Sequence, residues 1–246
     1  MDTAKKIYAA GCAALLCLSL SSCAHRAHKG QDTDLSAHAP AVPDKCTDPL
    51  SRGGKRISAR EISFCLAESL GKIKGWTQED YGPGGKPVSK AAVNVRPLAV
   101  KIDTKANAPL PNTEIILIEG KTFIRQNGTW KEADADSADK NYALISRMPR
   151  YFETMLNPKL RAAGTDPQQT YSIEGKTTLL GREVTKISAE NRDPQGRIPA
   201  RTFRFYVTKD YLTLKSEILQ DGKIISSSVV TAVDRYQQIR RPKISK

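Results

Sequence analysis

The chain has 246 residues and a formal net charge of +13, from 39 lysines and arginines against 26 aspartates and glutamates. This length allows one large domain or two small ones, with a core that needs no metal ion to hold it together, and a single domain is the simpler prediction. The positive charge favours anionic partners such as lipid headgroups or envelope polymers. All the histidines (His25, His28, His38) lie near the N-terminus. The remainder of the chain therefore lacks the residue on which Ser-His-acid and Cys-His catalysis and most histidine metal sites depend.

The N-terminus has the pattern of an export signal. Lys5 and Lys6 precede an apolar stretch at residues 7–20, and two small serines follow it. The stretch is too short for a stable membrane span, which needs roughly 20 apolar residues. Leu20-Ser21-Ser22-Cys23 resembles the bacterial lipobox. That resemblance implies cleavage before Cys23, a diacylglycerol on its sulfur and an acyl group such as palmitate on its new amino group. The alternative is a secreted protein with a chance cysteine at this position.

We therefore expect a lipoprotein signal peptide at residues 1–22 and a flexible tether at residues 23–45. The tether is rich in Ala, His, Asp, Ser, Gly and Pro and has no hydrophobic period. As a coil it would let the domain stand roughly 25 Å from the bilayer. Its histidines have no fixed geometry, so we expect a solvated linker and no metal there. Ala24 stands where many inner-membrane lipoproteins carry aspartate, which favours the outer membrane if the host is Gram-negative.

The cysteines outside the signal and the lipobox form one pair, Cys46 and Cys65. An even pair in an oxidising compartment is most simply a disulfide. It would tie the segment that enters the domain to the first helix. Two free thiols or a redox pair are the alternatives, and the spacing, far from Cys-x-x-Cys, argues against redox catalysis.

Periodicity in the first half of the domain predicts one helix followed by strands. Ser58 and Glu61 have the spacing of a capping box, and Ile62, Cys65 and Leu66 begin a helical apolar repeat. Tyr81-Gly-Pro-Gly-Gly then breaks the chain. Strand patterns follow at residues 98–103, 113–118 and 122–130, the last with Asn-Gly at 127–128, a strong hairpin signal.

The second half predicts short helices and then a meander. Residues 140–163 have one apolar face, interrupted by Pro149 and Pro158, which suggests an apolar lid or plug made of short helical pieces. Five strands follow at residues 171–179, 182–190, 201–209, 211–220 and 223–234, with turns at Gly181, Gly196 and Asp221-Gly222. The predicted fold class is α+β, with a curved antiparallel sheet around short helices in a single domain at residues 46–246.

Sequence motifs for catalysis are missing. There is no phosphate-binding loop, dinucleotide fingerprint or nucleophile elbow. Asp134, Asp136 and Asp139 alternate as in a calcium loop, but the glycine at the bend and the closing glutamate are missing. We therefore predict no enzyme activity, no catalytic residue, no cofactor and no metal, and export argues against nucleic acid as a partner.

The order of these parts resembles the periplasmic lipoprotein-carrier and lipoprotein-receptor superfamily (LolA/LolB-like, including LppX/LprG-type lipoproteins). The similarity covers residues 58–242 and rests on the order of four sequence motifs, at residues 114–130, 172–187, 202–217 and 233–242. It implies an unclosed or half β-barrel wrapped around helices, in which several members hold acyl chains. The Cys46/Cys65 pair, the Gly-Pro-Gly-Gly break and the high basic charge are not features of that resemblance.

Two functions follow from this resemblance. The first is a membrane-anchored, non-enzymatic carrier or receptor that binds an acyl chain of a lipid or lipoprotein in an apolar concavity. The second is an envelope interaction or sensory module whose core is filled and whose surface binds a protein or an anionic polymer. The expected lining residues of a concavity are Phe123, Ile124, Trp130, Phe152, Met155, Phe203, Phe205 and Leu214, and the expected headgroup contacts are Arg147, Arg150 and Arg204.

Overall fold

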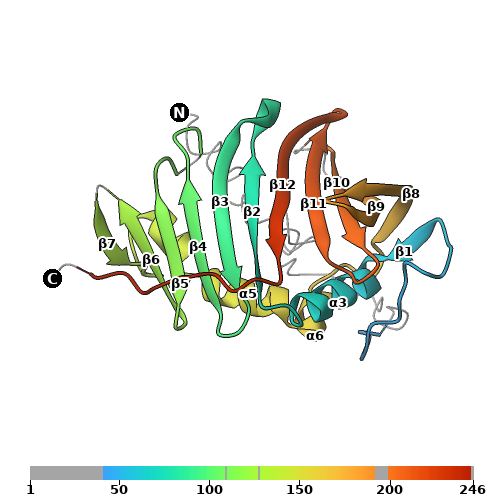
Figure 1. Cartoon of the computed structure of the whole chain (residues 1–246), viewed down its shortest axis with the longest axis horizontal. Coiled ribbons are helices and arrows are strands. Elements are labelled where there is room, and N and C mark those ends of the chain that lie inside the picture. Colours follow the sequence, from blue (N-terminus) through green and yellow to red (C-terminus); the bar gives the residue numbers. More distant parts are fainter. Residues whose placement is uncertain (1–40, 109, 127, 192–198, 245–246) are drawn as a thin grey trace, which may run out of the picture.

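The computed structural model of the chain describes residues 41–108, 110–126, 128–191 and 199–244. The predicted signal peptide, the lipobox at Cys23, most of the predicted tether and the expected turn at Gly196 lie outside these residues. The described part is dominated by one antiparallel sheet of 12 strands in the order β1-β8-β9-β10-β11-β12-β2-β3-β4-β5-β6-β7. The sheet is curved and does not close (Figure 1). The predicted α+β class and unclosed curved sheet are confirmed.

Two meanders build this sheet. The first consists of β2 (Gly75–Tyr81), the 3-10 turn η2 (Pro83–Gly85), β3 (Pro87–Asn94), β4 (Ala99–Thr104), β5 (Glu114–Ile118), β6 (Lys121–Gln126) and β7 (Thr129–Glu132). The second consists of β8 (Thr170–Leu179), β9 (Arg182–Asn191), β10 (Arg201–Thr208), β11 (Thr213–Gln220) and β12 (Lys223–Val233). All strands of the second meander were predicted from strand-like runs between turn signals, whereas β2 and β3 were not predicted.

The two meanders join through strands that are far apart in the sequence. β12 pairs with β2, and Ser228 lies opposite Asp80 in their register. The short strand β1 (Arg56–Ser58) pairs with β8 at the other edge. The junction therefore places the last strand of the chain in the middle of the sheet, where local periodicity gives no hint of it.

The helices are short and lie against one face of the sheet, here called the inner face. α3 (Ala59–Leu70) begins at Ser58, whose hydroxyl accepts a hydrogen bond from the Glu61 backbone N–H, as the capping spacing predicted. The predicted short helical pieces are confirmed as α4 (Lys140–Ile145), α5 (Met148–Leu156) and α6 (Pro158–Ala163). Among the described residues, no helix is long and apolar enough to cross a bilayer.

Apolar packing divides into two clusters along the inner face. The first lies between β2–β6 and α5 and includes Trp76, Val93 and Phe152. The second lies between α3 and β8–β10 and includes Leu66 and Phe205. Each helix thus covers its own part of the sheet, and the site described below lies in the first cluster.

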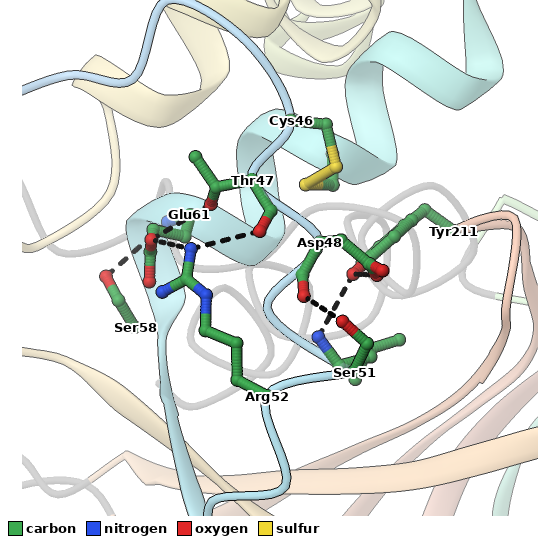
Figure 2. Close-up of polar contacts among 10 residues, drawn as sticks. Cys46, Thr47, Asp48, Ser51, Arg52, Ser58, Glu61 and Tyr211 are labelled. Carbon is green, nitrogen blue, oxygen red and sulfur yellow. Dashed lines mark hydrogen bonds and ion pairs between the residues drawn. A yellow bond between two sulfur atoms is a disulfide. The ribbon is translucent and has the colours of Figure 1, made fainter.

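The N-terminal segment of the described domain is fastened beside α3 (Figure 2). Cys46 and Cys65 form the predicted disulfide. Arg52 forms an ion pair with Glu61 at 2.9 Å, and the hydroxyl of Tyr211 donates to Asp48 at 2.5 Å. These contacts connect the entry segment to both α3 and the turn between β10 and β11.

Candidate ligand site between the sheet and helix α5

An apolar pocket lies between the inner face and α5. Its walls are three neighbouring strands and one face of the helix, formed by Trp76, Gln78, Ala91, Val93, Val100, Tyr151, Phe152 and Met155. In this conformation it has room for about one water molecule. Its strand wall follows from the register, because Trp76 lies opposite Val93 and Val93 lies opposite Val100.

Helix α5 closes the pocket because its apolar residues recur at helical intervals. Met148, Phe152 and Met155 are all buried and share one face of the helix. Pro149 lies in the first turn, where the missing N–H costs no hydrogen bond. The next helix, α6, starts at once, with the Asn157 side chain accepting from the N–H groups of Lys159 and Leu160. This region is therefore made of separate short helices, and the joint between α5 and α6 is a side-chain cap at Asn157.

A buried polar row crosses the sheet next to this pocket. Trp76 Nε1 donates to Gln78 Oε1 at 2.9 Å, and Gln78 Nε2 donates to Asp80 Oδ1 and to Ser228 Oγ, each at 2.9 Å. Asp80 also accepts from Ser89 Oγ at 2.6 Å and from Ser228. These hydrogen bonds offset much of the cost of removing the carboxyl group from water.

Burial raises the pKa of Asp80 above its ordinary value of 3.8, although the hydrogen bonds from Ser228, Ser89 and Gln78 act in the opposite direction. In the folded state the carboxyl therefore keeps its proton to a higher pH than in the unfolded state. The free energy of unfolding is expected to fall as the pH rises from 3.8 towards the folded pKa and then to stay level.

Asp80→Asn should remove this fall, because the amide does not titrate and can still bond to both serines. Urea unfolding at several pH values between 4 and 7 measures the effect.

Glu217→Gln is the control, because the contribution of Glu217 to the free energy of unfolding changes with pH in the opposite direction. Burial alone would raise the pKa of Glu217, but Lys215, Arg204 and Tyr206 hold it below its ordinary value. Wild type should therefore gain stability over this variant as pH rises from the acid range. An unchanged pH profile in Asp80→Asn would contradict the role assigned to Asp80.

The predicted lining residues are distributed over several places. Phe152 and Met155 line the pocket, and Ile124 packs in the same cluster. Phe203 and Phe205 belong to the second cluster, around α3, and Leu214 is buried on β11.

Two predicted lining residues lie on the opposite, outer face. Phe123 is next to Ile124 on β6, so its side chain points to the other side of the sheet. Its ring lies under the Arg241 guanidinium, 5.5 Å from its centroid. Trp130 lies opposite Arg125 in the register, beside the ion pair that Arg125 forms with Glu114. Neither side chain reaches a pocket on the inner face, because alternation separates neighbours to opposite faces.

The predicted headgroup arginines do not converge. Arg204 lies on the outer face, where it pairs with Glu174 at 3.0 Å and Glu217 at 3.2 Å. Arg147 and Arg150 are exposed at the start of α5. The acidic run has a local structural role, since Asp139 caps α4 through the Asn141 N–H. No cluster of His, Cys, Asp or Glu among the described residues could hold a metal ion.

Sequence reasoning missed a buried cation on the helix that follows α5. Arg161 on α6 is only 7% exposed, and burial lowers its pKa to about 10, while the phenols of Tyr151 and Tyr171 act to raise it. It therefore remains protonated at neutral pH. Arg161 was missed because a single arginine in a polar stretch predicts an exposed side chain. Trp76, Gln78 and Ala91 were missed because β2 and β3 were not predicted.

No protein-family model matches the sequence, and no curated protein is detectably similar to it. Some solved structures are similar to part of the chain. LprF from Mycobacterium bovis is 14% identical, with a TM-score of 0.47 over 75% of this chain and 96% of that one. Lipoprotein LppX from Mycobacterium tuberculosis is 10% identical, with a TM-score of 0.45 over 73% and 97%. MucB in its complex with MucA from Pseudomonas aeruginosa is 16% identical, with a TM-score of 0.42 over 70% and 56%.

At these identities and TM-scores the similarities do not assign a function, so the function proposed below is based on this chain's own residues.

Proposed function

We propose that this chain is a lipid-anchored envelope protein, held by Cys23 and a tether, that carries or receives an acyl chain of a lipid or lipoprotein without enzymatic chemistry. The observation that carries the proposal is the pocket between α5 and the inner face. Its helix wall is a short segment without a side-chain cap at its N-terminus, and its strand wall is a row of apolar side chains with one polar residue, Gln78. An acyl chain would enter by displacing α5 from this wall.

Burial would supply the affinity. At about 25 cal/mol per Å² of apolar surface, a few hundred Å² of acyl chain is worth several kcal/mol, enough for reversible transfer. The acidic end of a fatty acid or phospholipid could pair with Arg161, which lies near Tyr151 of the pocket. The hydroxyl of Ser216, buried opposite Ser228, has no hydrogen-bond partner among the described residues and offers a further polar contact.

Replacing Ala91 by tryptophan should block uptake. Ala91 lines the pocket and is 6% exposed, so an indole there would fill the space that the chain must enter. Ala92→Trp is the matched control, because Ala92 is the next residue on β3 and faces the outer side, opposite Lys101. The measurement is binding of a fluorescent fatty acid to the delipidated protein.

We expect at least about a tenfold weaker binding in Ala91→Trp, equivalent to about 1.4 kcal/mol, and wild-type binding in Ala92→Trp. Thermal unfolding of both variants shows whether they remain folded. No uptake by the wild-type protein, together with no lipid in mass spectra of material purified from its host, would contradict the carrier proposal.

The second candidate is a module with a filled core that binds a protein or an anionic polymer on its surface. The small free volume of the pocket favours it. A partner whose binding survives Ala91→Trp but is lost on reversal of surface charges would support this function against the carrier.

A further inference from the structure

Three segments meet at one end of the sheet. They are the loop between α3 and β2, the turn between β3 and β4, and the C-terminal segment after β12. The Val95 N–H donates to Lys74 O at 3.0 Å, and the Asp234 N–H donates to Gly75 O at 2.8 Å. The Lys74 N–H in turn donates to Asp234 Oδ1 at 2.9 Å. Gly75 permits this close approach, because a Cβ there would lie 2.1 Å from Val93 O and 3.0 Å from Arg235 O.

The C-terminal segment continues along this end of the sheet (Figure 1). Asn94 and Gln237 exchange two hydrogen bonds, of 2.9 and 2.7 Å, between the Asn94 amide and the Gln237 backbone. Further along, Arg241 pairs with Glu119 in the turn between β5 and β6 at 2.9 Å. The segment therefore has a defined place, and the side chains that it presents are held in position.

These segments gather positive charge into one surface, here called the basic rim and formed by Lys72, Lys74, Arg96, Arg235 and Arg241. All are exposed. The carboxylates nearby are Glu68, which pairs with Lys72, Glu119, which pairs with Arg241, and Asp234.

Three cations of the basic rim have no such partner. Lys74, Arg96 and Arg235 form no ion pair with any residue that the structure describes. Arg96 is nevertheless close to the loop after α3, since its Nη2 lies 3.7 Å from where a Cβ on Gly71 would sit. Tyr236, next to Arg235, is 58% exposed. Exposed cations beside an exposed tyrosine suit the headgroup layer of a bilayer, which takes both charged and aromatic side chains.

We propose that the basic rim docks the domain on an anionic phospholipid bilayer. The orientation follows from the register, because Trp76 and Val93 of the pocket wall are directly next to Gly75 and Asn94, the strand ends that lead into the rim. A domain resting on this rim therefore has the end of its pocket towards the lipid. Docking does not require a ligand in the pocket, so it can be tested separately from acyl binding.

The test uses vesicles and the chain from Ala24 onward, so that neither the expected signal peptide nor a lipid anchor contributes. Its cosedimentation is measured with vesicles of phosphatidylcholine alone and with vesicles that also contain phosphatidylglycerol. The rim variant carries Lys74→Glu, Arg96→Glu and Arg235→Glu. The control carries Lys86→Glu, Lys105→Glu and Lys223→Glu, with the same change in net charge. Those three residues are exposed at the opposite ends of the strands, in the turn after β2, after β4 and at the start of β12.

A basic residue at an anionic surface contributes about 1 kcal/mol, or about fivefold in partitioning. We expect binding only to the anionic vesicles, falling with added salt, and at least about a hundredfold weaker in the rim variant. The control variant should keep most of the binding. Equal loss in the two variants would show attraction by net charge alone and overturn the proposal. Binding to a soluble anionic polymer but not to vesicles would overturn it as well. Matching thermal unfolding of the two variants excludes misfolding as the cause.

Discussion

Phe152→Ala is expected to lower the free energy of unfolding by about 3–5 kcal/mol and at the same time to create a better ligand site. Phe152 is 2% exposed, and its ring packs edge-on against Tyr151 with centroids 5.5 Å apart. Removing it enlarges the pocket that it lines. An acyl chain that binds there stabilises the folded state, by about 2.7 kcal/mol when the free ligand is at about one hundred times its Kd. Urea unfolding with and without a fatty acid measures both effects.

Phe205→Ala is the matched control for this prediction. Phe205 is also 2% exposed, and it packs edge-on against Tyr171 with centroids 5.9 Å apart. It lies in the second cluster, away from the pocket. Both variants should lose similar stability, but the fatty acid should restore more of it in Phe152→Ala. Equal restoration in the two variants would mean that the ligand does not enter beside α5.

Removal of the disulfide is expected to lower the free energy of unfolding by about 3 kcal/mol. Cys46 and Cys65 are 19 residues apart, so the bond restricts a loop of moderate length in the unfolded chain. In the folded chain it holds the entry segment where Arg52 meets Glu61 and Asp48 meets Tyr211 (Figure 2). The double variant Cys46→Ala/Cys65→Ala, compared with wild type by urea unfolding, measures the loss.

A reductant provides the control for the disulfide. It should destabilise the wild-type protein by a similar amount and leave the double variant unchanged. A wild-type unfolding midpoint that does not move under reduction, once loss of the bond is verified by thiol labelling, would contradict the stabilising role.

The predicted strands bury mainly apolar side chains, whereas the missed strand β2 also buries polar ones. β10 (Arg201–Thr208) alternates apolar and polar residues, and the structure follows this alternation. β2 (Gly75–Tyr81) instead carries Trp76, Gln78 and Asp80 on its buried side, and two of these are polar. The sequence of β2 therefore shows no apolar-polar alternation. Gln78 and Asp80 can be buried because they form hydrogen bonds with Ser228 and Ser89, which lie on other strands.

The candidate site was only partly predictable for the same reason. Phe152 and Met155 were recognised because one helix face contains both. The opposite wall comes from β2, β3 and β4, and the neighbouring polar row needs Ser228 of β12. Phe123 and Ile124 were grouped by composition, although adjacent strand residues point to opposite faces.

By itself, the sequence determined the elements whose cause is local. These are the capped helix at Ser58, the short helices around Pro149 and Pro158, the meander from Thr170 to Val233 and the even cysteine pair, since caps, turns and periodicity act over a few residues. The tertiary structure alone decided what depends on distant residues. The pairing of β12 with β2 placed a polar row in the middle of the sheet. The packing of α5 made a pocket beside it, and the C-terminal segment brought Arg235 to the loop that contains Lys74. Each of these is a contact between residues separated by tens to more than a hundred positions, which no local pattern encodes.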